Sequence, residues 1–106
     1  MNLPTDYLEF VKDHGGEGFF VSEDAYLALW KVENLATRNA EYQVELWAPG
    51  LLVFGSDGGG EAYGFDTRQS TWPIVMVPFI GMEWKVVIPV GDSFSDFLHH
   101  LRERTS

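Results

Sequence analysis

Hydrophobic positions along the chain alternate between helical and strand spacing. Tyr7, Phe10 and Val11 are spaced i, i+3, i+4 and predict a first helix within residues 2–16. It ends at a pair of glycines, residues 15–16, because glycine accepts the left-handed conformation of a helix C-cap.

A second helical pattern fills residues 31–50. Leu35, Asn39, Tyr42 and Leu46 recur there at helical spacing, before a Pro-Gly pair that stops a helix. A third helix is predicted over residues 92–104, with Ser93 as N-cap and Asp96 three residues further on. Its core face consists of Phe94, Phe97, Leu98 and Leu101.

Short apolar and aromatic runs between these helices predict strands. The runs cover residues 18–21, 26–30, 51–55, 61–66, 73–79 and 83–91. The first two flank a turn-like segment and predict a hairpin. Pro89 in the last run marks a strand end or an exposed edge, because proline cannot donate to a ladder.

The order of these elements defines the expected fold class. Short loops between consecutive strands favour antiparallel neighbours. We therefore expect one α+β domain over residues 1–106, with a mainly antiparallel central sheet and flanking helices.

Composition narrows the class of protein. Hydrophobic residues make up 45% of the chain and aromatic residues 15%, enough to bury a core without metals or disulfides. The absence of cysteine excludes disulfides, thiolate zinc sites and cysteine nucleophiles. No run has the length of a membrane helix and the N-terminus has no basic leader, so we expect a cytoplasmic protein.

Charge is spread unevenly. The net charge is −9; residues 1–66 hold 12 acids against 3 bases, whereas residues 67–106 hold 4 of each. Such a field repels nucleic acid and anionic membranes and attracts a basic partner. Solubility alone is the simpler interpretation of the same charge.

The glycine-rich stretch 55–60 has the spacing of a phosphate-binding P-loop but not its chemistry. Glu61 and Ala62 stand where the motif needs lysine and serine or threonine, and a strand follows in place of a helix. The dinucleotide fingerprint also fails, because its last glycine is one residue too far along.

Two interpretations of this stretch remain open. Asp57 and Glu61, with Asp66 beyond them, could contribute to a non-standard calcium site, although the alternating ligands of an EF-hand are missing. The favoured interpretation is a hairpin turn, in which Asp-Gly begins the turn and the glycines supply positive φ.

No catalytic constellation is visible. His14 suits a helix C-terminus, whereas His99 and His100 are adjacent on a helix and point too far apart to chelate one metal. No serine lies in a nucleophile elbow. We expect no enzyme activity, metal or cofactor, and one or two of the four tryptophans (30, 47, 72 and 84) to be partner anchors.

The ordered segments "YLALWKVENLATRNAEY" and "APGLLVFGSDGGGEAYGFDTR", with the flanking helices, resemble the SUKH superfamily across nearly the whole chain. These are small bacterial relatives of the yeast cell-wall-synthesis regulator linked to killer-toxin resistance. The resemblance implies an α+β fold without an established catalytic centre. It also implies an immunity protein that binds and neutralises a toxin domain, often a nuclease.

Combined with the charge, this resemblance gives a docking hypothesis. A basic toxin surface is expected to bind the acids of the hairpin and loops before residue 67, namely Glu17, Glu23, Asp24, Asp57 and Glu61. The alternatives are a housekeeping scaffold or regulatory module, closer to the yeast role, and an enzyme or a metal- or small-ligand-binding domain. A cleft with clustered polar groups would favour the last of these.

Overall fold

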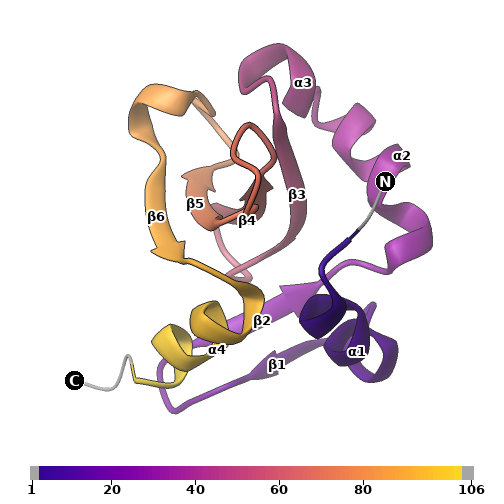
Figure 1. The fold of residues 1–106 in the computed structure, drawn as a ribbon, viewed down its shortest axis with the longest axis vertical. Coiled ribbons are helices and arrows are strands. Elements are labelled where there is room, and N and C mark those ends of the chain that lie inside the picture. The colour runs from indigo at the N-terminus through magenta and orange to yellow at the C-terminus, as the bar shows by residue number, and fades with distance from the viewer. Residues whose placement is uncertain (1–2, 104–106) are drawn as a thin grey trace.

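The computed structural model describes residues 3–103 and contains one six-stranded sheet with four α-helices (Figure 1). In chain order the helices are α1 (Thr5–His14), α2 (Leu35–Glu41), α3 (Val44–Trp47) and α4 (Phe94–Arg102). The strands are β1 (Gly18–Phe20), β2 (Tyr26–Leu29), β3 (Leu51–Ser56), β4 (Glu61–Asp66), β5 (Ile74–Pro78) and β6 (Ile88–Gly91). Two short 3₁₀ turns, η1 (Val32–Asn34) and η2 (Trp84–Val86), complete the path. The expected α+β class is confirmed.

The sheet is a meander in which every strand pairs antiparallel with the next. β1 and β6 are its two edges, so the predicted hairpin of the first two strands and the edge position of Pro89 are confirmed. The turn between β3 and β4 is also a hairpin turn, in which Gly58 has φ +84°. Asp57 Oδ1 accepts hydrogen bonds from Gly59 N and Glu61 N and thereby closes this turn.

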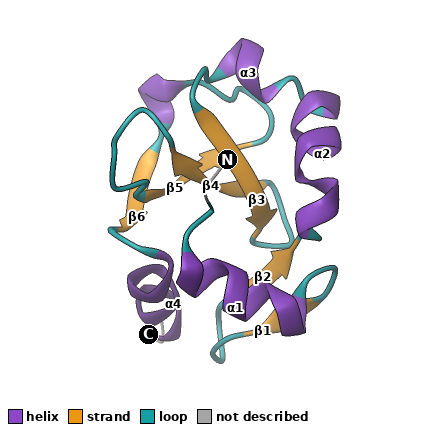
Figure 2. Ribbon diagram, turned by 45° about the vertical axis from the view of Figure 1, so that its right-hand side comes forward, coloured by secondary structure: helices purple, strands orange, loops and turns teal. Residues whose placement is uncertain are grey.

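Helices α1 and α4 lie side by side against one face of the sheet (Figures 1 and 2). An aromatic core fills the space beneath them, with Tyr7, Phe54, Phe65, Phe94 and Phe97 all nearly inaccessible. The predicted cap of α4 is present, because Asp96 N donates to Ser93 Oγ at 3.1 Å. Both amphipathic helices therefore bury the faces that their periodicity predicts.

The prediction of a single helix over residues 31–50 is wrong. The chain forms η1, α2 and α3, and Gln43 interrupts the path with a left-handed φ of 55°. Leu35 of α2, Val44 of α3 and Ala48 directly after α3 are buried, whereas Leu46, expected on the core face, is 66% exposed. One continuous helix would rotate Val44 away from Leu35, so burying both anchors requires a break between them.

The strand predicted over residues 83–91 is shorter than expected. Trp84 lies in η2, where its indole Nε1 donates to Pro49 O at 2.7 Å, and pairing starts only at Ile88. A tryptophan in the middle of an apolar run reads as strand from the sequence. Here its N–H is satisfied by a backbone carbonyl far along the chain, and this contact draws the segment out of the sheet.

Candidate functional site

A cleft of about 780 Å³ lies at the β1–β2–β3 end of the sheet. Phe19 of β1 stacks on Phe10 of α1, with ring centroids 5.9 Å apart. Successive strand residues point to opposite faces, so Gly18, Tyr26 and Ala28, which line the cleft, face away from α1. The cleft is therefore on the sheet face that α1 leaves uncovered.

The floor of the cleft is a cross-strand row of small residues. Gly18 pairs with Ala28, and Ala28 pairs with Ser56. The ring of Tyr26 packs against the glycine positions on either side, and a Cβ at Gly58 would lie 2.5 Å from Tyr26 Cδ2. The glycine-rich turn is thus shaped to accommodate Tyr26, and its glycines serve packing as well as turn geometry.

Three aromatic rings form the opposite wall. Trp30 and Tyr42 are stacked with centroids 5.8 Å apart, and Tyr42 lies 4.8 Å from Phe79. Ile80 follows at the rim and is 93% exposed. The cleft therefore offers apolar surface, some of it fully open to solvent.

Helix α2 carries Arg38 to this wall, and Asn39 fixes the helix on β3. Asn39 Nδ2 donates to Val53 O at 2.8 Å, and Val53 N donates to Asn39 Oδ1 at 2.9 Å. The amide side chain pairs with β3 as a neighbouring strand would. Arg38 is thereby held with its guanidinium carbon 4.8 Å from the centroid of the Trp30 ring.

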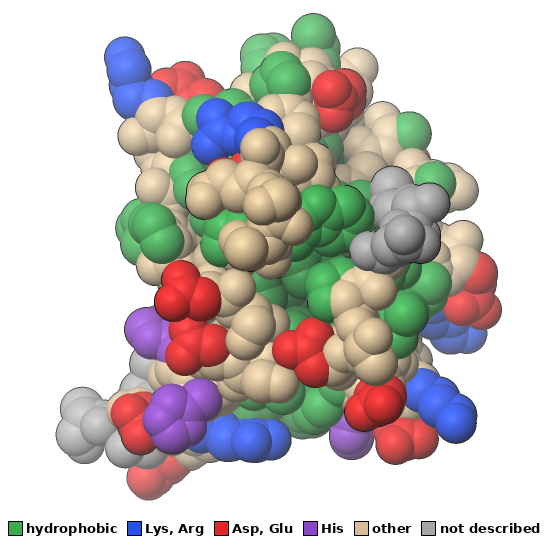
Figure 3. All heavy atoms as spheres, in the orientation of Figure 1, with side chains coloured by type: hydrophobic (Ala, Val, Ile, Leu, Met, Phe, Trp, Pro, Cys, Tyr) green, Lys and Arg blue, Asp and Glu red, His purple; other side chains and the backbone are tan. Residues whose placement is uncertain are grey.

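The five acids predicted to form a docking face lie beside β1 and β2 and at the two ends of the β3–β4 turn. Glu17 precedes Gly18, Glu23 and Asp24 precede the strand that carries Tyr26, and Asp57 and Glu61 bound the turn that holds Gly58. The first three are exposed and the last two half-buried. Of these acids, Glu17 lines the cleft. Acidic side chains also spread over the lower half of the face drawn in Figure 3.

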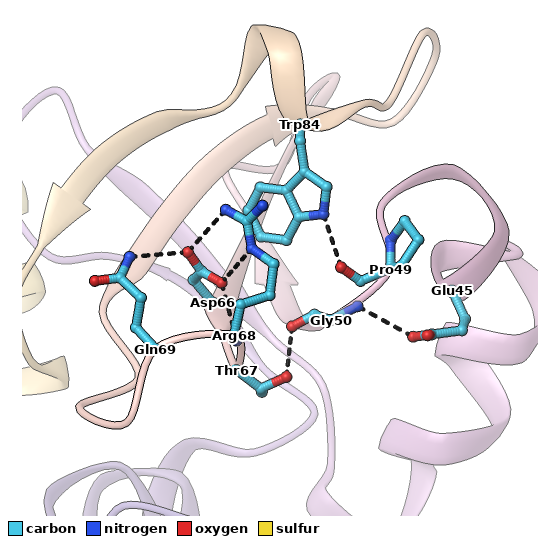
Figure 4. A network of polar contacts seen from close by, with 8 residues as sticks. All are labelled: Glu45, Pro49, Gly50, Asp66, Thr67, Arg68, Gln69 and Trp84. Atoms are coloured by element: carbon cyan, nitrogen blue, oxygen red, sulfur yellow. Dashed lines mark hydrogen bonds and ion pairs between the residues drawn. The ribbon is translucent and has the colours of Figure 1, made fainter.

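Asp66 does not join the other acids. It lies at the far end of β4 from Glu61, is 2% exposed, and is bound by its neighbours (Figure 4). Arg68 Nε and Nη2 donate to its two oxygens at 2.9 and 3.1 Å, and Gln69 Nε2 donates at 3.0 Å. These hydrogen bonds, the one from Arg68 first, hold the pKa of Asp66 below its usual value. Within residues 3–103 no three acidic or histidine side chains form a metal-binding group.

Tyr7 lies on the other side of the sheet, in the core beneath α1. Burial raises the pKa of Tyr7 to about 12. The hydrogen bond to Asp66 raises the pKa of Arg68. Tyr7, Asp66 and Arg68, whose pKa values are displaced, all lie outside the cleft. The cleft combines aromatic rings, an exposed isoleucine and charged side chains.

Sequence reasoning missed the cleft wall, because Trp30, Arg38, Tyr42 and Phe79 come from three separate segments. One signal could have found the rim. Ile80 precedes Gly81, which has φ +81°, and a large apolar residue in a turn is hard to bury. The expectation that one or two tryptophans are partner anchors stays a prediction; Trp47 on α3 is 55% exposed and lies outside the cleft lining.

The chain is a small α+β meander domain with an open cleft at one end of its sheet. The chain belongs to the SMI1/KNR4 family (SUKH-1), whose family model matches residues 1–100. SUKH domains are generally non-catalytic protein-interaction modules. No curated protein matches the chain. Among the described helices, none has the length and apolar character needed to cross a bilayer.

Proposed function

We propose that this domain is a non-catalytic immunity protein, which binds a cognate toxin domain in the cytoplasm and neutralises it. The observation that carries the proposal is the position of five acids beside β1 and β2 and at the β3–β4 turn, next to an open cleft, in a chain of net charge −9. A nuclease toxin presents a basic surface to phosphates, and an acidic protein occupies such a surface in place of the polyanion. Family membership supports a binding role.

The test is co-expression with the product of the neighbouring gene. Rescue of growth and co-purification of the two proteins would support the proposal. Growth arrest despite expression of the folded domain would contradict it, and binding without rescue would favour the scaffold or regulatory role.

A charge-reversal pair tests the docking face itself. The double variant Glu23→Lys, Asp24→Lys should weaken binding at least about tenfold, because charge complementarity across an interface sets association rate and affinity. The matched control is Glu9→Lys, Asp13→Lys, which changes net charge equally on the exposed side of α1. Equal loss in both variants, or binding insensitive to salt, would contradict docking at this face.

A further inference from the structure

The cleft holds two cations without an acidic partner in a strongly acidic chain. Arg68 is the one lysine or arginine in an ion pair with a carboxylate among residues 3–103. Lys31 and Arg38 both line the cleft, where the acid among the lining residues is Glu17. The lining therefore carries a net positive charge, opposite in sign to the molecule as a whole.

Arg38 is positioned and has free donors. Its guanidinium lies over Trp30, and its side chain makes no hydrogen bond to another described residue. A guanidinium carries five N–H donors in a planar fork that matches a carboxylate. Because α2 is fixed by Asn39, little freedom is lost when such a carboxylate binds.

The apolar wall lies next to these cations. Tyr42 and Phe79 form an accessible aromatic surface stacked on the buried Trp30, and Ile80 extends it beyond the rim. Across the floor, the small residues Ala28 and Ser56 leave room for a side chain. One ligand can therefore contact rings and cations at the same time.

The glycine-rich turn argues against a phosphate as that ligand. Gly58 N already donates to Ser56 Oγ at 3.2 Å, and Gly59 N donates to Asp57 Oδ1 at 2.8 Å. A phosphate cradle requires such N–H groups to be free. Glu17 at the rim would also repel a polyphosphate.

We propose that the cleft binds a short segment of a partner protein in which a large apolar or aromatic side chain is flanked by carboxylates. The apolar side chain packs on Tyr42 and Phe79, which stack on the buried Trp30, while a carboxylate pairs with Arg38 and a second with Lys31. Glu17 belongs both to this cleft and to the acids proposed to meet a basic toxin surface, whereas the other four of those acids do not line the cleft. Binding of such a segment goes beyond the immunity function and does not depend on the partner being a toxin.

The experiment is an NMR titration of the isotope-labelled domain with blocked peptides. The first probe has Gly-Ser ends and a central phenylalanine between two pairs of glutamates. The second replaces the glutamates with lysines, and the third replaces the phenylalanine with alanine. We expect the first peptide to shift the amide signals of residues 28–31, 38–42 and 79–80, and to bind at least about tenfold more tightly than either control peptide.

Variants then separate the cleft from general electrostatics. Arg38→Gln should weaken binding of the glutamate peptide about tenfold, since it removes a charge-assisted contact. Lys85→Gln removes an unpaired, exposed cation outside the cleft and should leave the affinity unchanged. Folding of each variant is verified from its own spectrum.

Several outcomes would overturn the proposal. These are equal or tighter binding of the lysine peptide, equal loss in Lys85→Gln, or no shifts around the cleft. Tighter binding of adenosine monophosphate at the same residues would assign the cleft to a nucleotide. Failure of the toxin-rescue experiment leaves this result unaffected, because the peptides contain no toxin sequence.

Discussion

Two arginines of this domain lie over tryptophan rings, but their surroundings differ. The guanidinium carbon of Arg68 is 3.4 Å from the centroid of the Trp84 ring, and two nitrogens of Arg68 donate hydrogen bonds to Asp66 (Figure 4). Arg38 is 4.8 Å from the centroid of Trp30 and has no carboxylate partner within residues 3–103. Each site thus has an arginine over a tryptophan ring, but a carboxylate binds the arginine at only one of the two sites.

The difference follows from what surrounds each arginine. Asp66 is buried at the end of β4, so its charge must be compensated inside the fold, and Arg68 and Gln69 do this. Arg38 faces an open cleft and pairs with no carboxylate of the described residues. The first arginine serves stability and the second is available for recognition. The following predictions test that distinction, from the largest expected effect to the smallest.

The largest effect is expected from the residue that places Arg38. Asn39→Ala should lower the free energy of unfolding by about 3 kcal/mol, because it leaves two buried backbone groups of Val53 without partners. Chemical denaturation measures the change. Asn34→Ala is the matched control, since the side chain of Asn34 is exposed and caps nothing, and it should cost less than about 0.5 kcal/mol. Equal losses would mean that the amide bridge to β3 does not hold α2.

The next effect concerns Asp66 and depends on pH. Its pKa is lowered in the folded state from an ordinary value of 3.8, so the unfolded chain takes up the proton first. The stabilisation is therefore complete above pH 3.8 and is lost as the pH falls through the lower, folded pKa. Asp66→Asn should cost about 2 kcal/mol at neutral pH.

Denaturation curves of Asp66→Asn and the unmodified protein between pH 7 and pH 2 provide the measurement. The gap in stability between the two proteins should narrow below pH 3.8. A gap that stays constant across this range would show that the carboxylate charge does not stabilise the fold.

The sequence predicted most of this architecture, for reasons that particular residues show. The patterns of α1 and α4 are governed by contacts within one helix face, and Tyr7 and Phe97 are buried as expected. The break at Gln43 and the shortening of the last strand were not predictable. The first follows from burying Leu35 and Val44 together in the core, and the second depends on the contact of Trp84 with Pro49, which is distant in sequence. The cleft was missed for the same reason, because its floor is set by the pairing of β1, β2 and β3.

The third prediction compares the loss of stability caused by replacing each of the two arginines. Arg68→Gln should lower the melting temperature, because Asp66 loses its charged partner while remaining buried. Arg38→Gln removes one contact with a ring and should change stability by no more than about 1 kcal/mol. Calorimetry measures the loss of stability in the two variants, which change net charge equally. A larger loss in Arg38→Gln would reverse the roles assigned to the two residues.

The smallest effect is expected when a carboxylate is introduced beside Arg38 and Trp30. Asn34 lines the cleft four residues before Arg38, so Asn34→Asp places an acid one helical turn away, at the N-terminal end of α2. An acid–arginine pair at this spacing should add about 0.3–0.5 kcal/mol of stability. The same carboxylate should compete with the glutamate peptide and weaken its binding. A double-mutant cycle of Asn34→Asp with Arg38→Gln isolates the interaction between the new carboxylate and the guanidinium. If the effects of the two substitutions on stability and on peptide affinity are additive, the guanidinium is not free to bind a carboxylate. If the two substitutions are coupled in both measurements, the guanidinium of Arg38 pairs with a carboxylate when one is present. Arg38 would then differ from Arg68 because the fold gives it no carboxylate partner.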